Sequence, residues 1–408
     1  MWSQFNFYSV GLNLSKTSMN LLSSIGIRQD IEELSFSPIR EIVRSAEDLK
    51  DVIPFWFGEP DVSTPEFIRD ETKKSLDRGE TFYAPNSGQR HLRESIADYM
   101  NGLYGSRIST EQITVSISGM NAIMLCAQAL LPYGSKVVVL LPSWPNIPAV
   151  QRIMGAKVEG VPIGMKEGKW CLDMEKVFDA CDSKTAAIII NSPNNPSGWT
   201  MSNEEQKTLL EFTRKKGIWI VGDEVYARIS FNANHAPSFC EVMEEGDRVI
   251  IVNSFSKSWA MTGWRLGWIT APANLGVQFE KLNEYNVAGP PPFIQQAGIA
   301  ALKEGEAFIQ ESNNRYLNAL SHFTEWANAQ ERIEFAPPVA AFYAFFKIRE
   351  GNDSLEMAKD LLKKGVGLAP GRAFGPQFDS YLRLCFASSI PKLEKGLNRL
   401  EDWLMDFE

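Results

Sequence analysis

The chain has 408 residues, enough for two or three domains with separate hydrophobic cores. It carries 41 basic and 50 acidic side chains, a formal net charge of −9, and no long basic stretch, so we expect no nucleic acid partner. No apolar run approaches the roughly 18 residues of a membrane span, and the N-terminus lacks the basic-then-apolar order of a signal peptide. We therefore expect a cytoplasmic protein that does not contact a membrane.

The cysteines and histidines do not indicate a metal site or a disulfide framework. The five cysteines are scattered, odd in number and without a Cys-x-x-Cys pair: Cys126, Cys171, Cys181, Cys240 and Cys385. The three histidines lack the spacing of metal ligands: His91, His235 and His322. Because nothing in the sequence sets a low thiol pKa, cysteine catalysis is not expected either.

The N-terminal region is predicted to hold one helix and one strand. Residues 1–30 mix polar and apolar side chains without clear periodicity, so we predict an N-terminal arm. Residues 37–49 are predicted to form a helix with Ser37 at its cap and Pro38 in its first turn. Residues 52–57 are predicted to form a short strand.

Beyond residue 60 the sequence alternates between helical segments and short apolar segments. The predicted helices are 65–78, 92–104, 121–131, 146–154 and 203–216. The predicted strands are 113–117, 136–141, 157–161, 185–190, 218–221, 249–252 and 266–269. Strands that are apolar on both faces and alternate with helices are typical of an α/β fold, with a mostly parallel sheet covered by helices on each side. Ligands of such sheets bind beyond the carboxyl ends of the strands.

The C-terminal part is predicted to form a second, smaller α+β domain. A long helical segment at 307–329 leads out of the sheet region. It is followed by a predicted strand, helix, strand and helix at 341–347, 354–364, 382–386 and 390–407. We predict a small domain from residues 31–60 and 316–408, and a large domain from residues 61–315.

Lys257 lies in an unusual position for a lysine. It ends the segment Ser254-Phe255-Ser256-Lys257, just beyond the apolar run 249–252, and Arg265 follows eight residues later. Burial there would disfavour the ammonium form and lower the pKa, so that the neutral amine could attack a carbonyl carbon and form a Schiff base. The alternative is a solvated surface charge, as for most lysines.

Two further loops also follow predicted strands. The turn Ser118-Gly119-Met120 opens a helix, where backbone N–H groups can bind a phosphate. The segment 191–198 contains two prolines and three asparagines, and it is predicted to hold the amide of Asn195 in a rigid turn, with a cis Asn195–Pro196 bond. A plain tight turn is the alternative reading of this second loop.

Asp223 directly follows another apolar strand and is close in sequence to Tyr226. A buried carboxylate needs a hydrogen-bond donor or a cation, although Asp223 could instead cap a helix. A phosphate-binding turn, an amide, a buried acid, a tyrosine and a lysine at one sheet edge fit pyridoxal 5′-phosphate. This cofactor needs a lysine for its aldehyde and an anionic partner for its pyridinium nitrogen.

These residues occur in blocks that resemble a known family. The chain resembles the fold-type I pyridoxal-phosphate enzymes of the class I/II, aspartate aminotransferase-like family, from Ser37 to the C-terminal helix. The specific blocks are Asn-Asn-Pro-Ser-Gly at 194–198, Asp-Glu-Val-Tyr at 223–226, and Ser-Phe-Ser-Lys at 254–257 with Gly-Trp-Arg at 263–265. The resemblance implies a large domain with a mostly parallel seven-stranded sheet flanked by helices, and a smaller α+β domain.

The resemblance also implies a role for each residue around the cofactor. Lys257 would carry the Schiff base and move the proton between the substrate Cα and the cofactor C4′. Asp223 would keep the pyridinium nitrogen protonated. Asn195 and Tyr226 would hydrogen-bond the phenolic oxygen, and Trp144 would stack on the ring. The phosphate would be held by Gly119, Met120, Ser254, Ser256, Arg265 and, from the other subunit, Tyr83, which implies a homodimer with shared active sites.

For the substrate, Arg383 matches the arginine that grips the α-carboxylate, with Asn195 and Gly58 completing the clamp. A surface ion pair is the alternative for Arg383. Some bacterial aspartate aminotransferases carry a lysine at the position of Met120, so strict aspartate specificity is not implied. Arg40 could bind a distal carboxylate or could be a solvated helix residue.

The resemblance implies a pyridoxal-phosphate-dependent aminotransferase. It would move an amino group from an L-amino acid to a 2-oxo acid such as 2-oxoglutarate by a ping-pong mechanism. Two alternatives remain open: a β-eliminating C–S lyase with the same cofactor contacts, and a non-catalytic regulator that binds the cofactor. Such regulators usually add a DNA-binding domain, and the N-terminal 30 residues are too short and not basic enough for one.

Overall fold

The computed structural model describes residues 26–407. The chain divides into two compact units, residues 1–35 and 36–408. The described part of the first unit contains one short helix, α2 (Gln29–Glu32). Most of the predicted N-terminal arm, residues 1–30, lies outside the described residues, and its role stays a prediction.

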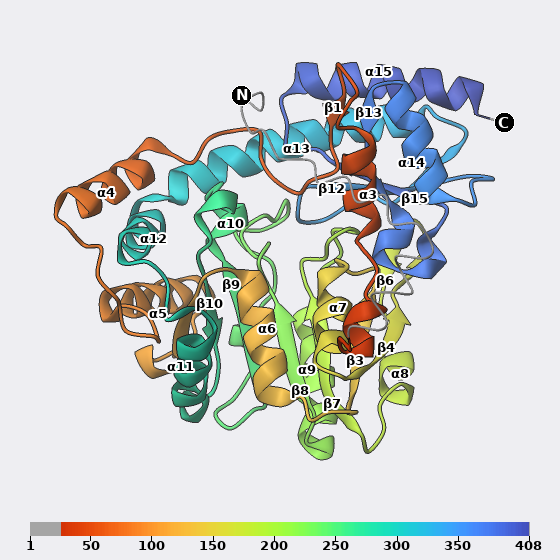
Figure 1. Cartoon of the computed structure of the whole chain (residues 1–408). Coiled ribbons are helices and arrows are strands. Elements are labelled where there is room, and N and C mark those ends of the chain that lie inside the picture. Colours follow the sequence, from red (N-terminus) through yellow and green to blue (C-terminus); the bar gives the residue numbers. More distant parts are fainter. Residues whose placement is uncertain (1–25, 408) are drawn as a thin grey trace. The chain divides into compact units, whose positions relative to one another are not determined.

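The second unit is built around the mostly parallel sheet that the sequence predicts (Figure 1). The sheet has seven strands in the order β2-β10-β9-β8-β7-β3-β4. Strand β10 is antiparallel to both neighbours, and β9, β8, β7, β3 and β4 run parallel. In this order the strands are Ile113–Ser116, Gly267–Thr270, Val249–Ser254, Trp219–Asp223, Thr185–Asn191, Lys136–Leu141 and Lys157–Pro162.

Alternate side chains of these strands enter two different hydrophobic cores. Ile188 and Ile190 of β7 belong to one core, whereas Ile189, one residue away, belongs to the other. This is why the strands are apolar on both faces. Helix α6 (Gly119–Leu130) packs across β8 and β9 on one side, and α5 (Arg90–Tyr104) and α12 (Pro292–Glu304) contribute to the core on the other.

Five predicted helices of this region are present, within one or two residues at most ends. They are α4 (Glu66–Asp77), α5, α6, α7 (Asn146–Ile153) and α9 (Asn203–Lys216). Four features were not predicted from the sequence: α8 (Met174–Asp179), α11 (Ala273–Val287), α12, and a hairpin of β5 (Gly164–Lys166) and β6 (Lys169–Cys171). In α12 the buried positions are mostly small residues, so the apolar stripe that usually reveals a helix is weak.

The C-terminal elements form the smaller α+β region. An antiparallel sheet has the order β11-β12-β15-β14, with strands Ile333–Phe335, Tyr343–Ile348, Tyr381–Cys385 and Ala369–Pro370. Its helices are α3 (Pro38–Ser45), α13 (Glu306–Asn328), α14 (Ser354–Lys363) and α15 (Ile390–Asp406). Strand β1 (Ile53–Pro54) pairs in parallel with β13 (Val366–Gly367), so a segment preceding the large sheet joins this region.

Two details of these elements bear on the predictions. Ser37 stands at the N-terminal cap position of α3 as predicted, but its side chain makes no capping hydrogen bond. Helix α13 runs without interruption across the predicted domain boundary at 315/316. The exact boundaries of the two domains stay a prediction.

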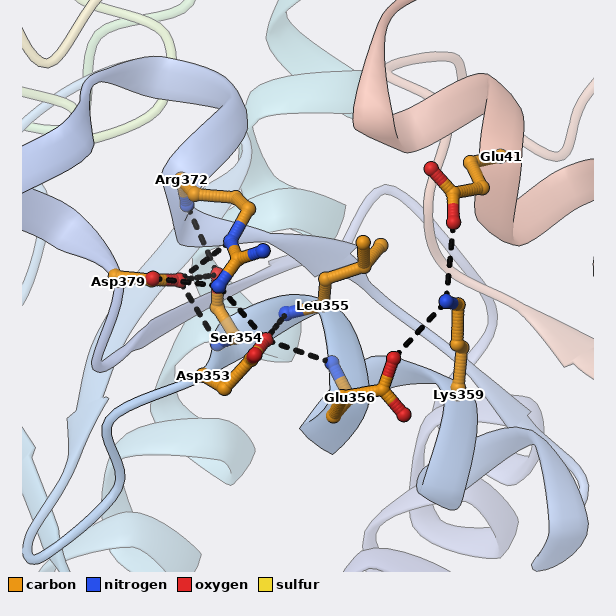
Figure 2. A network of polar contacts seen from close by, with 8 residues as sticks. All are labelled: Glu41, Asp353, Ser354, Leu355, Glu356, Lys359, Arg372 and Asp379. Atoms are coloured by element: carbon orange, nitrogen blue, oxygen red, sulfur yellow. Dashed lines mark hydrogen bonds and ion pairs between the residues drawn. The ribbon is translucent and has the colours of Figure 1, made fainter. Parts of the chain in front are cut away.

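A network of charged side chains connects α3, α14 and the segment before β15 (Figure 2). Asp353 caps α14 by accepting hydrogen bonds from the backbone N–H groups of the second and third helical residues, both at 3.1 Å. Arg372 pairs with Asp353 at 2.8 Å and with Asp379 at 2.6 Å. Lys359 of α14 pairs with Glu41 of α3 at 3.0 Å. The network therefore fixes the start of α14 against its neighbours.

We predict that Asp353→Ala lowers the free energy of unfolding by about 1 kcal/mol, because α14 loses its N-terminal cap. Urea denaturation of the cofactor-free protein measures this change as a lower midpoint. Lys363→Ala is the matched control on the same helix, since it removes only an exposed ion pair with Asp360. Equal effects of the two substitutions would contradict the assignment of Asp353 as the cap.

Candidate active site

Three neighbouring parallel strands end at the same edge of the large sheet. Strand β7 ends at Asn191, β8 at Asp223 and β9 at Ser254. Asn191 is paired in register with Asp223, and its side-chain Nδ2 donates to Asp223 Oδ2 at 3.1 Å. The Asn195–Pro196 bond in the loop after β7 is cis, as predicted. The polar residues predicted from separate loops therefore come together at one edge.

Lys257 lies in the short helix α10 (Phe255–Ser258), directly after β9. It is half-buried, and its Nζ donates a hydrogen bond to the carbonyl oxygen of Gly58 at 2.6 Å. Burial lowers the pKa of Lys257 to about 8, against a smaller opposing effect of Cys385 and Glu59. A substantial fraction of this amine is therefore neutral near physiological pH, as a nucleophile or a base requires.

Asp223 is 2% exposed and has one carboxylate oxygen without a partner. Its Oδ2 accepts from Asn191, whereas no described residue donates a hydrogen bond to Oδ1. Burial raises the pKa of Asp223 to about 7, although the Val225 backbone N–H and the charge of Lys257 oppose this rise. A cation or N–H donor placed against Oδ1 would favour the charged carboxylate.

Asn195 is hydrogen-bonded to both Tyr226 and Arg383. Asn195 Nδ2 donates to Tyr226 Oη at 3.4 Å, and Arg383 Nη1 donates to Asn195 Oδ1 at 2.8 Å. The Lys257 Nζ atom lies 5.7 Å from the centroid of the Tyr226 ring. The lysine, the tyrosine, the amide and the arginine therefore form one connected group.

Arg383 of β15 is buried without an acidic partner among the described residues. Its guanidinium carbon lies 4.6 Å from the centroid of the Tyr343 ring and 4.9 Å from that of Phe374. Nη2 donates to the carbonyl oxygen of Trp56, and Nε has no partner within residues 26–407. A buried guanidinium is costly unless it is paired. The surface-ion-pair alternative for Arg383 does not fit this environment, and an anionic ligand does.

The residues predicted to hold a phosphate lie beside the same edge. Gly119 is the first residue of α6, and a Cβ added to it would lie 3.4 Å from the Cβ of Ser254. The Ser254 and Ser256 hydroxyls are 2.9 Å apart. Arg265 donates to the Thr262 carbonyl oxygen at 2.7 Å and has no acidic partner in the described chain. The start of α6, the two hydroxyls and the residue Arg265 therefore all lie beside the same end of the sheet.

For four further predicted residues the structure shows few contacts or none with the rest of the site. Tyr83 is 93% exposed. Trp144 is half-buried just before α7. The sulfur of Met120 accepts a weak hydrogen bond from Asn146 Nδ2 at 3.5 Å. Arg40 is exposed, with its guanidinium carbon 5.0 Å from the centroid of the Phe57 ring.

Three residues that line the site were not predicted from the sequence. Tyr343 Oη lies 2.7 Å from Tyr226 Oη, the Phe374 ring centroid lies 4.9 Å from the guanidinium carbon of Arg383, and Trp56 supplies a carbonyl acceptor. Each lies in or beside an apolar stretch and reads as a core residue. The tyrosine hydroxyl, which needs a hydrogen-bond partner when buried, is the one signal that could have identified Tyr343.

The described residues show no metal-binding cluster and no membrane-spanning helix. Within residues 26–407 no group of three or more His, Cys, Asp or Glu side chains could hold a metal ion. In the same part of the chain no helix is long and apolar enough to cross a membrane. All five cysteines are free thiols.

Comparison with known proteins identifies the family. Residues 50–400 match the family model for class I and II aminotransferases. The chain belongs to this family. It is 32% identical over 370 residues to an aspartate aminotransferase of Pyrococcus horikoshii, covering 90% of this chain and 94% of that protein.

Two further similar proteins are also aminotransferases. The chain is 29% identical over 382 residues to aromatic-amino-acid aminotransferase 2 of Thermococcus litoralis, covering 92% of this chain and 97% of that protein. The structure of Thermus thermophilus aspartate aminotransferase with maleate has a TM-score of 0.86 and 28% identity, with 92% of this chain and 99% of that chain covered. The predicted family and fold class are therefore confirmed, and the protein is an aminotransferase.

Enzymes of this family use pyridoxal 5′-phosphate, and the residues of the aminotransferase fit it. The unpartnered Oδ1 of Asp223 can accept a hydrogen bond from a protonated ring nitrogen. The amine of Lys257 is partly neutral near pH 8 and can bond to an aldehyde. The start of α6 offers backbone N–H groups to a phosphate. These donors and acceptors match different parts of one cofactor.

We predict that Lys257 of the cofactor-free aminotransferase is acylated half-maximally near pH 8, because burial lowers its pKa to about that value. Competitive labelling with an amine-acylating reagent, followed by peptide mass spectrometry, measures this pH for each lysine. Lys363 is a control in the same sample, since its exposed amine pairs with Asp360, which raises its pKa. A Lys257 profile that coincides with that of Lys363 would rule out the depressed pKa.

Proposed function

We propose that the protein transfers an amino group from an L-amino acid to a 2-oxo acid, with pyridoxal 5′-phosphate bound at the ends of β7, β8 and β9. The observation that carries this proposal is the connected group of Lys257, Tyr226, Asn195 and Arg383 beside the unpartnered oxygen of Asp223. When bound, the cofactor supplies a sink for the electrons released as the Cα–H bond breaks.

Several residues would hold this cofactor. Asp223 would keep the ring nitrogen protonated, and Asn195 and Tyr226 would donate hydrogen bonds to the phenolic oxygen. Trp144 would stack on the ring. The phosphate would be held by Gly119, Met120, Ser254, Ser256 and Arg265. Tyr83, which is 93% exposed, would complete the phosphate site of a second subunit, so the proposal includes a homodimer with shared sites.

Lys257 has two tasks in this proposal. In the resting enzyme its Nζ would bond to the cofactor aldehyde. As a free amine it would accept the proton from the substrate Cα. A base with a pKa of about 8 suits this task, because it is partly neutral at working pH and still basic enough to accept the proton. The carbonyl of Gly58, 2.6 Å from Nζ, orients the amine.

Arg383 binds the α-carboxylate of the substrate. Its guanidinium carbon lies within 5 Å of the centroids of both the Tyr343 and Phe374 rings, and these contacts would restrict its movement. Each hydrogen bond to a charged group of this kind contributes roughly 1.5–3 kcal/mol. Asn195 contacts Arg383 directly and would complete the clamp together with Gly58.

Two residues bear on which amino acid is the donor, and they favour donors with different side chains. Met120 is apolar where some aspartate aminotransferases have a lysine, which favours a donor without a second carboxylate. Arg40, on the helix that precedes the site, favours a dicarboxylate such as aspartate. 2-Oxoglutarate is the proposed acceptor. The relatives named above are aminotransferases for aspartate and aromatic amino acids, which favours amino transfer over β-elimination or a regulatory role.

We predict that the reconstituted enzyme converts its bound cofactor to the amine form with one group of amino acids and regains the aldehyde form with 2-oxoglutarate. A spectrophotometric screen of the twenty amino acids measures both half-reactions. Preference for aspartate would show that Arg40 or another cation binds the distal carboxylate, and preference for apolar or aromatic donors would agree with the apolar side chain of Met120. Lys257→Ala is the control, and it should lose the absorbance of the lysine-bound cofactor and all but a trace of turnover.

The same screen separates amino transfer from elimination. Release of pyruvate and ammonia from a cysteine-like substrate, in the absence of any 2-oxo acid, would favour the lyase. Full turnover by the Lys257→Ala variant would overturn the proposed chemistry, because no other lysine occupies this position in the described chain.

A further inference from the structure

Tyr343 of β12 lies where three parts of the proposed site meet. It is fully buried, and its hydroxyl lies 2.7 Å from that of Tyr226. Its ring packs against the guanidinium of Arg383. A Cβ added to Gly58 would overlap its hydroxyl, so only glycine permits this approach. Tyr343 therefore contacts the proposed phenolic-oxygen donor, the proposed carboxylate clamp and the residue whose carbonyl holds Lys257.

The hydrogen-bond capacity of Tyr226 fixes the direction of the contact between the two hydroxyls. A tyrosine hydroxyl can donate one hydrogen bond and accept two. In the proposed function Tyr226 donates its one proton to the cofactor. Its two acceptor positions then receive Asn195 Nδ2, at 3.4 Å, and the Tyr343 hydroxyl. Tyr343 has no other hydrogen-bond partner among the described residues, so its proton is available for Tyr226.

We infer that Tyr343 is a positioning residue that donates a hydrogen bond to Tyr226 and thereby directs and strengthens the hydrogen bond from Tyr226 to the cofactor. This inference rests on the proposed function, because it assigns the acceptor of Tyr226 to the cofactor. A donor to Tyr226 Oη withdraws electron density from that oxygen and makes its own proton a better donor, as in other hydrogen-bond chains.

The surroundings hold Tyr343 in place for this role. Its ring meets that of Tyr226 edge-on, with centroids 5.6 Å apart and an interplanar angle of 79°. The rings of Phe342 and Tyr343 also pack edge to face, with centroids 5.0 Å apart. With Arg383 on its face and Gly58 at its hydroxyl, the side chain has little room for another orientation.

Both hydroxyls stay protonated in the working pH range. Burial raises the pKa of Tyr343 well above its usual value, and burial also raises that of Tyr226, against the opposing effects of the Tyr343 hydrogen bond and of Arg383. The other titratable groups that face the pair are Asp223 of β8, Lys257 of α10 and Cys385 of β15. A pH-dependent absorbance change of the holoenzyme therefore does not come from either tyrosine.

The test is the pH midpoint at which the absorbance band of the lysine-bound cofactor gains a proton. A hydrogen bond from Tyr226 would stabilise negative charge on the phenolic oxygen of the cofactor. This stabilisation is largest in the form of the lysine-bound cofactor that lacks the titrating proton. Weakening the hydrogen bond should therefore raise the midpoint. We expect Tyr343→Phe, which keeps the ring, to raise it by roughly half to one pH unit, the equivalent of one ordinary hydrogen bond.

A double-substitution cycle tests whether Tyr343 changes the pH midpoint through Tyr226 or through a general change in the site. Tyr226→Phe should raise the midpoint more than Tyr343→Phe does. The variant with both substitutions should match Tyr226→Phe alone, because Tyr343 then has nothing to act through. Tyr316→Phe is the matched control: it alters a buried tyrosine that packs on Phe342 and is not hydrogen-bonded to Tyr226, and it should leave the midpoint unchanged.

A second replacement keeps the test decisive if Tyr343→Phe folds poorly. Site-specific 3-fluorotyrosine at position 343 preserves the hydroxyl and makes it a stronger donor, so the midpoint should fall. An unchanged midpoint in a folded, cofactor-loaded Tyr343 variant, or a shift that persists in the Tyr226→Phe background, would overturn the inference. Absence of the lysine-bound band in the unaltered protein would instead count against the proposed function.

Discussion

Desolvation of charged groups at the end of three parallel strands is the constraint on which the site depends. Parallel pairing of β7, β8 and β9 brings Asp223 and the Lys257 helix to one edge. Burial there raises the pKa of Asp223 to about 7 and lowers that of Lys257 to about 8. Each group therefore has a pKa close to neutral pH, so a bound cofactor or substrate can change its protonation state.

The smaller α+β region supplies the other residues of the site, and there too a charged group is buried. Arg383 is buried beside two aromatic rings with no acidic partner among the described residues, so its charge is available to an anionic ligand. Tyr343, on the neighbouring strand β12, contacts both this arginine and Tyr226. Residues from the two regions of the chain thus form one connected hydrogen-bonded group.

Much of this arrangement could be predicted from the sequence, because the information is local. Apolar runs such as 187–190 end in polar loops, and Asn195, Asp223 and Lys257 each lie within five residues of the end of such a run. Tyr343 could not be predicted, since its partner Tyr226 is 117 positions away and its own segment is almost entirely apolar. The environment of Arg383, beside Tyr343 and Phe374, also depends on long-range packing. Helix α12 was missed because small buried residues leave little pattern.

The central claim is that Lys257 is the residue bonded to pyridoxal 5′-phosphate. Reduction of the holoenzyme with sodium borohydride makes such a bond permanent, and peptide mass spectrometry then locates it. We expect one cofactor adduct, on the peptide that contains Lys257. An adduct on a different lysine, or none in a protein that has retained the cofactor, would contradict it.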